Sequence, residues 1–177
     1  MNPKQNAKFT SQEYWDERFA EEDEYEWLGS LADFEELLDL APHSLILVAG
    51  CGNSRLSQDL EKLGHFVVST DFAPSAALTQ KNKYQMSQYV TADCRALIFQ
   101  QRFDLVIEKG VFDAMVADDN PWDLTPSSRQ MVDDVITCAR SCAERFISIY
   151  RVCSPAISLI NVSTGLLGRI RHRCLKK

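Results

Sequence analysis

Several features are missing from this 177-residue sequence, and each absence argues against a class of protein. The six cysteines contain no C-x-x-C pair, which argues against a zinc ribbon. No apolar run reaches the ~18–20 residues that a membrane-spanning helix needs. The chain starts with polar residues, which do not predict a secretory signal segment. We therefore expect a cytoplasmic protein with reduced thiols, no membrane span and no metal site.

Basic residues are scarce in the first part of the chain. Residues 1–40 hold twelve acidic and three basic side chains, whereas residues 140–177 hold one acidic and eight basic ones. The net charge of the whole chain is −6. A protein that is acidic overall and has only a short basic end does not fit a dedicated nucleic-acid binder. Its length and its 45% apolar residues suit one domain with a packed core.

The most informative stretch is a short apolar run that ends in two glycines. Residues 45–49 are apolar throughout, which is typical of a strand covered on both faces in a parallel sheet. Gly50 and Gly52 follow, and glycine allows both a sharp turn and a close approach of a ligand to the backbone. Ser54 can then cap a helix with apolar positions at residues 56, 60 and 63. Ligands of open α/β sheets bind over such a strand, turn and helix.

Acidic residues follow the next two predicted strands. Residues 65–70 predict a strand, and Asp71 stands 19 positions after Gly52, where nucleoside-binding α/β folds hold a ribose. A helix cap or a turn is the other interpretation of Asp71. Asp93 and Cys94 follow a short strand predicted at residues 89–92. At that place a carboxylate and a backbone N–H suit the edge of a purine.

Periodicity predicts the remaining elements of one α/β domain. We expect helices at residues 9–19, 31–40, 76–86 and 127–144, and further strands at 103–107 and 145–150. Residues 157–162 fit either a strand or part of an amphipathic helix. Cys138 and Cys142 lie at positions i and i+4 of the long helix, where they suit metal ligands or, more often, small core residues.

A cluster of aromatic residues precedes the first predicted strand: Tyr14, Trp15, Phe19, Tyr25 and Trp27. Aromatic side chains offer large and rigid surfaces, and this property allows two interpretations. In the first, the segment simply covers the sheet. In the second, it forms a lid that stacks on a flat cofactor ring.

Together these motifs resemble class I S-adenosylmethionine-dependent methyltransferases. Four strings sharpen the resemblance: Tyr14-Trp15-Asp16-Glu17-Arg18-Phe19, Glu26-Trp27, Gly50-Cys51-Gly52-Asn53-Ser54-Arg55-Leu56-Ser57 and Glu108-Lys109-Gly110-Val111-Phe112-Asp113-Ala114. Over roughly residues 9–150 the chain is similar to the methyltransferase-like family that modifies lysines of translation elongation factor 1-alpha. The resemblance implies a Rossmann-like, mostly parallel α/β sheet with helices on both faces, and S-adenosyl-L-methionine as the cofactor.

The resemblance also implies which residues contact the methionine end of this cofactor. Trp15, Phe19 and Trp27 would close over the methionine chain and the sulfonium. Gly50 would let the backbone approach the cofactor, and Lys109 would lie near the methionine moiety. These contacts come from the aromatic segment, from the glycine turn and from the end of the strand predicted at 103–107.

At the nucleoside end of the cofactor, the resemblance implies four contacts. Asp71 would hold the ribose hydroxyls, and Phe72 would lie against the adenine ring. Asp93 and Cys94 would bind the edge of the adenine. The implied activity is protein-lysine N-methylation, with elongation factor 1-alpha as the protein substrate. Glu108 is either the group that takes or orients the lysine proton or a structural acid at a strand end, so no catalytic residue is assigned.

The chain departs from the family after residue 150. Family members continue with a helix and two strands that complete a seven-stranded sheet, and residues 151–177 do not match that region. We therefore expect a methyltransferase domain at residues 1–150, without the usual last strands, and an atypical basic tail at 151–177 from truncation or alternative splicing. Two other functions stay open: a non-catalytic, S-adenosylmethionine-binding form that acts only in interactions, and a nicotinamide-dependent oxidoreductase, which shares the glycine turn and the acid after the second strand.

Overall fold

The computed structural model describes residues 7–84, 88–117, 119, 123–151, 157–163 and 170–175, and from residue 150 onward it describes the backbone alone. Two expectations therefore lie outside the described residues. One is the end of the helix expected at residues 76–86. The other is the character of the basic tail, whose side chains are not described.

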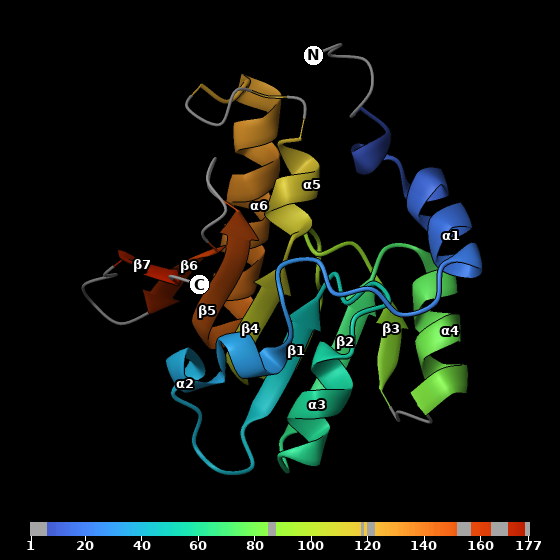
Figure 1. Cartoon of the computed structure of the whole chain (residues 1–177). Helices are drawn as coiled ribbons and strands as arrows, with labels where there is room; N and C mark the ends of the chain where they lie inside the picture. Colours follow the sequence, from blue (N-terminus) through green and yellow to red (C-terminus); the bar gives the residue numbers. More distant parts are fainter. Residues whose placement is uncertain are drawn as a thin grey trace.

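Five strands form the parallel part of one sheet (Figure 1). They are β1 (Leu45–Ala49), β2 (Phe66–Asp71), β3 (Tyr89–Thr91), β4 (Phe103–Lys109) and β5 (Ala143–Arg151). Their order is β3-β2-β1-β4-β5, and each neighbouring pair is parallel. The order reverses between β1 and β4, so a crevice opens beyond the carboxyl ends of these strands. This is the Rossmann-like sheet that the sequence predicts.

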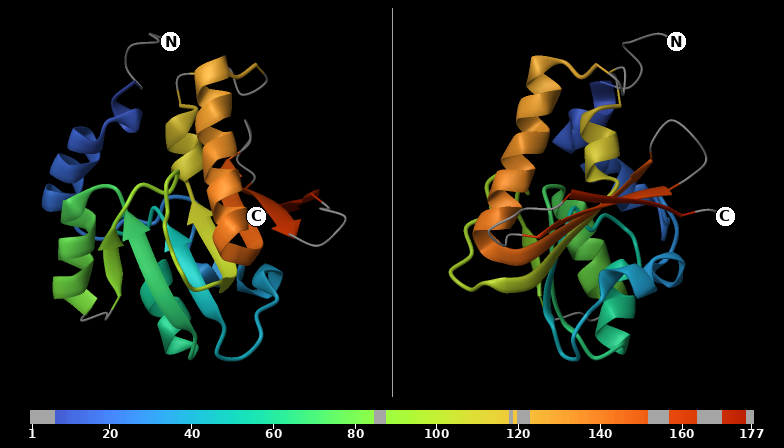
Figure 2. Two further views of the ribbon diagram at one scale, coloured as in Figure 1. Left: turned by 180° about the vertical axis from the view of Figure 1, so that it is seen from behind. Right: turned by 90° about the vertical axis from the view of Figure 1, so that its left-hand side faces the viewer.

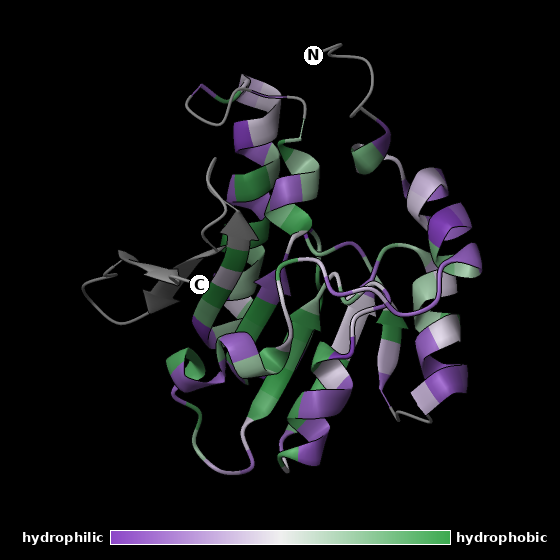
Figure 3. Cartoon of the chain, in the orientation of Figure 1, coloured by the Kyte–Doolittle hydropathy of each residue, from purple (hydrophilic) through white to green (hydrophobic). Residues whose placement is uncertain are grey.

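Helices cover both faces of the sheet (Figure 2). On one face, α3 (Leu56–Lys62) and α2 (Glu35–Leu38) pack over Ile46 and Val48 of β1. On the other face, α6 (Pro126–Cys142) and α5 (Val111–Met115) pack over Leu47 and Ala49. Successive side chains of a strand point to opposite faces, so an unbroken apolar run serves two cores. The hydrophobic colour of the central strands in Figure 3 shows the result.

The first helical segment divides into two pieces where the sequence predicts one helix at residues 9–19. A 3₁₀ turn, η2 (Ala7–Thr10), precedes α1 (Gln12–Glu21). Ser11 lies between them as the N-cap of α1, and its Oγ accepts a hydrogen bond from Tyr14 N at 3.3 Å. The backbone of Ser11 is extended, so the 3₁₀ turn ends before it, and its side chain caps α1, which begins after it. This explains the division.

The helix α1 lies against α4 (Pro74–Tyr84), above the carboxyl end of the sheet (Figure 1). Ser75 N donates to Asp16 Oδ1 at 2.6 Å, and Gln12 Nε2 donates to Phe72 O at 2.5 Å. The aromatic segment is therefore fixed to the domain by polar contacts as well as by its rings.

The single helix predicted at residues 31–40 was wrong. The chain forms a 3₁₀ turn, η3 (Leu31–Asp33), and then the short helix α2, with Phe34 at φ −143° between them. Ser30 and Asp33 form a capping box, which satisfies the backbone groups of a tight first turn. Phe34 and Leu38 are still buried, so the apolar spacing identified the buried side correctly while the helix itself breaks.

The long helix ends two residues earlier than the sequence predicts, because Ala143 already belongs to β5. Cys142 is buried in the core with Val135 and Ala139. Cys138 Sγ lies 3.0 Å from Leu97 N, within hydrogen-bonding distance. These contacts match the interpretation of both cysteines as core residues rather than metal ligands.

The sheet continues beyond β5, which corrects the expected absence of the last strands. β6 (Ile157–Ser163) pairs antiparallel with β5, and β7 (Ile170–Leu175) pairs antiparallel with β6. Residues 157–162, for which the sequence left strand and helix open, therefore form a strand. Ile157, Ile160 and Val162 have the branched side chains that strands favour, and an open edge of a sheet offers unpaired N–H and C=O groups to such a segment.

Two kinds of feature are absent from the described residues. Among them, none of the helices combines the length and the apolar character needed to cross a bilayer. Nor do three or more His, Cys, Asp or Glu side chains gather there as a metal site would require.

Candidate functional site

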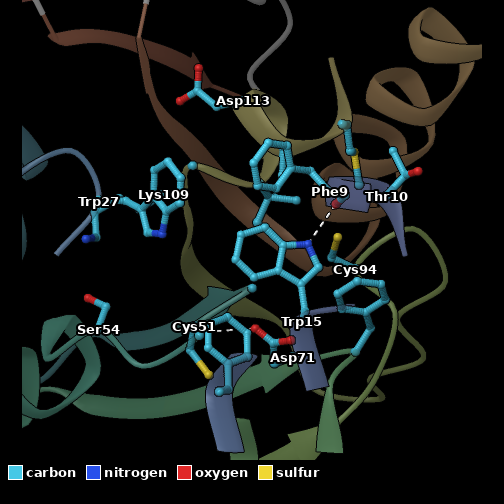
Figure 4. Close-up of a pocket in the computed structure, with 18 of the residues that line it drawn as sticks. Phe9, Thr10, Trp15, Trp27, Cys51, Ser54, Asp71, Cys94, Lys109 and Asp113 are labelled. Carbon is cyan, nitrogen blue, oxygen red and sulfur yellow. Dashed lines mark hydrogen bonds between the residues drawn. The ribbon is translucent and has the colours of Figure 1, made fainter. Parts of the chain in front are cut away.

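A cavity of about 200 Å³ lies above the carboxyl ends of β1, β2 and β4 (Figure 4). The aromatic segment and α5 form its sides. All nine residues that the sequence assigned to a cofactor line this one cavity: Trp15, Phe19, Trp27, Gly50, Asp71, Phe72, Asp93, Cys94 and Lys109. They span residues 15 to 109 and come from five separate parts of the chain, so the fold brings together residues that lie far apart in the sequence.

Asp71 lies at the floor of the cavity and is 5% exposed. Its Oδ2 accepts a hydrogen bond from Gly52 N at 2.8 Å, and its Oδ1 accepts one from Ala73 N at 2.9 Å. Burial raises the pKa of the Asp71 carboxyl to about 6, although these two backbone donors lower it. A carboxylate offers about four lone-pair sites, so two acceptor positions remain for a ligand with paired hydroxyls.

The glycine turn adopts backbone angles that other residues rarely take. Gly50 has φ +68° and Gly52 has φ +50°. A Cβ atom at Gly50 would lie 2.2 Å from Val111 Cγ2, and one at Gly52 would lie 3.1 Å from Phe19 Cζ. Glycine is therefore needed at both positions because α5 and the aromatic segment approach the turn closely.

Aromatic rings form the wall opposite this turn. Trp15 is stacked on Phe19 with ring centroids 5.2 Å apart. Its indole N–H donates to Phe9 O at 2.7 Å, the dashed line beside the Phe9 label in Figure 4. Trp27 meets Trp15 edge to face at 6.2 Å. The Arg18 guanidinium lies 5.3 Å from the Trp27 ring centroid and 5.4 Å from that of Trp15. The rings thus line a cavity as well as packing against Ala76 of α4, and stacking of the segment on a cofactor ring stays a prediction.

An ion pair joins the aromatic segment to the end of β4. Lys109 Nζ lies 2.5 Å from Glu26 Oε2 and donates to Gly29 O at 3.2 Å. The same carboxylate accepts from Ser54 Oγ at 2.8 Å and from Arg55 N at 2.7 Å. Ser54 Oγ also accepts from Leu56 N at 3.1 Å, but the N-cap of α3 is Arg55, one residue later than the sequence predicts.

Asp93 and Cys94 lie on the side of the cavity beyond β3. The Asp93 carboxylate is paired with the Arg95 guanidinium, whose Nη2 lies 2.5 Å from Oδ2. That hydrogen bond holds the pKa of Asp93 below its ordinary value. Cys94 is 9% exposed, and burial raises the pKa of its thiol to about 12. The thiol is therefore neutral near pH 7 and acts as a small apolar surface beside the cavity.

Glu108 does not line the cavity. Its Oε2 accepts from Val111 N at 2.9 Å and from Phe112 N at 3.4 Å, so it satisfies the first N–H groups of α5. Ser148 Oγ donates to its other oxygen. Burial raises the pKa of Glu108 to about 8, and the hydrogen bond from Ser148 opposes that rise. This geometry favours the structural interpretation of Glu108 over the role of a base.

Sequence reasoning missed several lining residues. Phe9, Thr10, Met115 and Met131 extend the cavity toward η2, α5 and α6. Their positions depend on how these helices pack over the sheet, and no local pattern in the sequence shows it. Asn53 also lines the cavity and is 4% exposed. The sequence could have indicated it, because it directly follows the second glycine of the turn.

The order of the strands and the place of the cavity are those of a class I methyltransferase fold. A family model described as "Methyltransferase domain" matches residues 47–132. A TehB-like S-adenosylmethionine-dependent methyltransferase from Corynebacterium glutamicum superposes with a TM-score of 0.54 at 21% identity, over 86% of this chain and 76% of the other. Magnesium protoporphyrin IX methyltransferase from Synechocystis, in a structure with bound SAM, superposes with a TM-score of 0.51 at 22% identity. The match covers 80% of this chain and 59% of the other.

Curated relatives narrow this class. The mouse protein named EEF1A lysine methyltransferase 4 is 36% identical over 96% of this chain and 68% of its own length. The cattle protein of the same name is 35% identical over 92% of this chain and 64% of its own length. The chain therefore belongs to the EEF1A lysine methyltransferase 4 family, and it spans about two thirds of the length of these relatives.

The cofactor of this class is S-adenosylmethionine, and the cavity suits it. The buried Asp71 carboxylate fits a ribose diol, the aromatic wall fits a sulfonium and a flat base, and Lys109 fits a carboxylate. The matches to methyltransferases favour this cofactor over the nicotinamide alternative.

Proposed function

We propose that this chain is an S-adenosylmethionine-dependent protein-lysine N-methyltransferase and that its substrate is translation elongation factor 1-alpha. The observation that carries the proposal is the gathering of nine residues from five parts of the chain around one cavity at the sheet's switch point. The names of the curated relatives supply the substrate class.

Each of the nine residues assigned from the sequence has a proposed task toward the cofactor. Asp71 accepts hydrogen bonds from the ribose hydroxyls, and Phe72 lies against the adenine. Asp93 and the backbone N–H of Cys94 bind the adenine edge. These tasks rest on the family resemblance together with the place of each residue along the cavity.

The methionine end would lie between the glycine turn and the aromatic wall. Gly50 leaves the backbone accessible there, and Lys109 pairs with the methionine carboxylate. Trp15, Phe19 and Trp27 enclose the sulfonium. This arrangement is supported by the lining of the cavity, which includes Gly50, Lys109 and all three rings.

When bound, S-adenosylmethionine supplies a methyl group on a good leaving group, so positioning and exclusion of water provide most of the catalytic effect. A lysine amine has a reference pKa of ~10.4 and must lose its proton before it attacks. A cavity walled by Trp15 and Phe9 disfavours the charged amine and so promotes that loss. We assign no base, because Glu108 is committed to the N-terminus of α5.

The experiment that tests this proposal has two parts. Calorimetric titration with S-adenosylhomocysteine measures cofactor binding, and we expect saturable binding to the folded chain. Transfer of a labelled methyl group to recombinant elongation factor 1-alpha measures activity, with substrate lysine-to-arginine variants to locate the site. Binding without transfer would favour the non-catalytic form instead, and the absence of binding by a folded chain would overturn the proposal.

We also propose that the protein works in the cytoplasm. Four cysteines are free thiols in the described part of the chain: Cys51, Cys94, Cys138 and Cys142. Free thiols suit a reducing compartment. Cell fractionation with an antibody to the endogenous protein tests this location.

A further inference from the structure

The proposed function explains only one member of the ion pair that Glu26 and Lys109 form beside the cavity. Lys109 has a proposed task, whereas Glu26 does not line the cavity and has none. The Lys109 side chain is only 3% exposed, and Glu26 Oε2 lies 2.5 Å from its Nζ. A buried ammonium without a partner carries a large free-energy penalty, so this carboxylate is needed to keep a cation at the end of β4.

Glu26 joins its own loop to two other segments that converge on the cavity. It takes hydrogen bonds from Ser54 Oγ and Arg55 N after the glycine turn, and from Lys109 at the end of β4. It belongs to the loop that carries Trp27, which lies beside Lys109 and Ser54 in Figure 4. The carboxylate therefore fixes the lysine and adds a negative charge directly behind it.

That negative charge matters because the two forms of the cofactor differ by one positive charge. S-adenosylmethionine carries a sulfonium, and S-adenosylhomocysteine has a neutral thioether in its place. Both carry the same methionine carboxylate, ammonium and nucleoside. Without the Glu26 carboxylate, the charge around Lys109 would be more positive by one unit with either ligand bound, which would repel the sulfonium and favour the product over the substrate.

Among the residues that the structure describes, both cations that line the cavity have a carboxylate partner. Arg95 is paired with Asp93, and Lys109 is paired with Glu26. The Arg95 side chain is 40% exposed, so water screens it, whereas the buried Lys109 depends on its partner. The carboxylates of Asp71 and Asp113 also line the cavity, and they stay the same in the variants below, so the Lys109 pair is where the charge near a sulfonium is changed.

We propose that Glu26 is a positioning residue that sets the preference of the cavity for S-adenosylmethionine over S-adenosylhomocysteine, by neutralising Lys109. This inference rests on the proposed function.

The test compares the dissociation constants of both ligands, measured by calorimetry, for the wild-type chain and for Glu26→Gln. We expect the ratio of the S-adenosylmethionine constant to the S-adenosylhomocysteine constant to rise on the order of tenfold, as one added unit-charge repulsion in a partly buried site predicts. Contacts to the shared carboxylate and nucleoside cancel in this ratio. An equal loss of affinity for both ligands would show that Glu26 only anchors the loop, which would overturn the inference.

Glu24→Gln is the matched control on the same loop. Glu24 contacts Lys83 and Tyr84 on α4 and the Arg55 guanidinium, and it does not line the cavity. Its loss loosens the loop without changing the partner of Lys109. We expect the ratio of dissociation constants to stay at the wild-type value, whatever happens to each affinity.

Lys109→Met provides the second, opposite measurement and covers the case in which Glu26→Gln does not fold. It leaves Glu26 as an unpaired anion behind the wall, so the ratio should fall below the wild-type value although both affinities weaken. A ratio that does not fall would contradict the inference. Binding of S-adenosylhomocysteine to the wild-type chain is checked first, and its absence would remove the proposed function rather than this inference alone.

Discussion

The ends of β2 and β4 each carry a buried carboxylate, yet the two carboxylates have different surroundings and different roles. Asp71 and Glu108 are 5% and 0% exposed, and burial raises the pKa of each, to about 6 and about 8. Asp71 lines the cavity, whereas Glu108 turns to the N–H groups of Val111 and Phe112.

The difference between them lies in the segment that comes after each strand. After β4 a single glycine, Gly110, leads directly into α5, so the free N–H groups of the helix lie within reach of Glu108. After β2 a helix also begins three residues later, but its first residue, Pro74, has no N–H to offer. Asp71 accepts from Ala73 N with one oxygen, and its other oxygen reaches across to Gly52 N in the glycine turn. The donors within reach of each acid therefore decide whether its carboxylate stays at the cavity.

The largest expected effect comes from removing the cavity's carboxylate. Asp71→Ala should weaken binding of S-adenosylhomocysteine on the order of 100-fold, because charge-assisted hydrogen bonds to two hydroxyls are lost together. Calorimetric titration measures this change. Asp71→Asn, which keeps one acceptor oxygen, should retain part of the affinity, and thermal unfolding shows whether both variants fold. Wild-type affinity in a folded Asp71→Ala chain would remove Asp71 from the site.

Removing the carboxylate at β4 should instead lower stability. Glu108→Ala leaves the N–H groups of Val111 and Phe112 and the Ser148 hydroxyl without their acceptor, at a cost of roughly 1–3 kcal/mol in the free energy of unfolding. Denaturant unfolding measures this cost, and binding of S-adenosylhomocysteine should change little.

The variant Glu108→Gln sharpens this second prediction. Its amide still offers an acceptor oxygen but no longer titrates. Because the folded-state pKa of Glu108 lies above its ordinary value of 4.5, the native chain binds the extra proton and its stability falls as pH rises from about 4.5 to about 8. That slope should shrink in Glu108→Gln. Loss of methyl transfer in a stable Glu108→Gln chain would instead favour the role of a base.

The sequence predicted the strands and the strand-end residues best, and the physical reason is that both depend on local pattern. The apolar run at 45–49 must be a buried strand, and glycines with positive φ must follow it where Val111 and Phe19 approach. The family resemblance added the aromatic residues, whose role as a wall depends on the packing of α1 against α4.

The apolar and glycine patterns of the sequence do not reveal several other features. Whether Glu108 faces the cavity is decided by the start of α5, and the position of Met131 in the wall is decided by the packing of α6. The helix breaks at Phe34, whose φ of −143° is not helical, although the apolar spacing continues through it. The pairing of β6 with β5 follows from the open edge of the sheet, which only the assembled fold provides.

The smallest expected effect is a dependence of binding on pH that should separate the two acids once more. Asp71 has a folded-state pKa of about 6 against an ordinary value of 3.8, so below pH 6 the chain without ligand holds a proton that binding of a diol must displace. The dissociation constant for S-adenosylhomocysteine should therefore rise by up to about tenfold per pH unit as pH falls below 6. Titrations between about pH 5 and pH 7.5 measure this trend, which Asp71→Asn should abolish and Glu108→Gln should retain. The same trend in Asp71→Asn would show that another group titrates. Asp71 would then not be the acid whose protonation opposes ligand binding, and the proposed difference between Asp71 and Glu108 would fail.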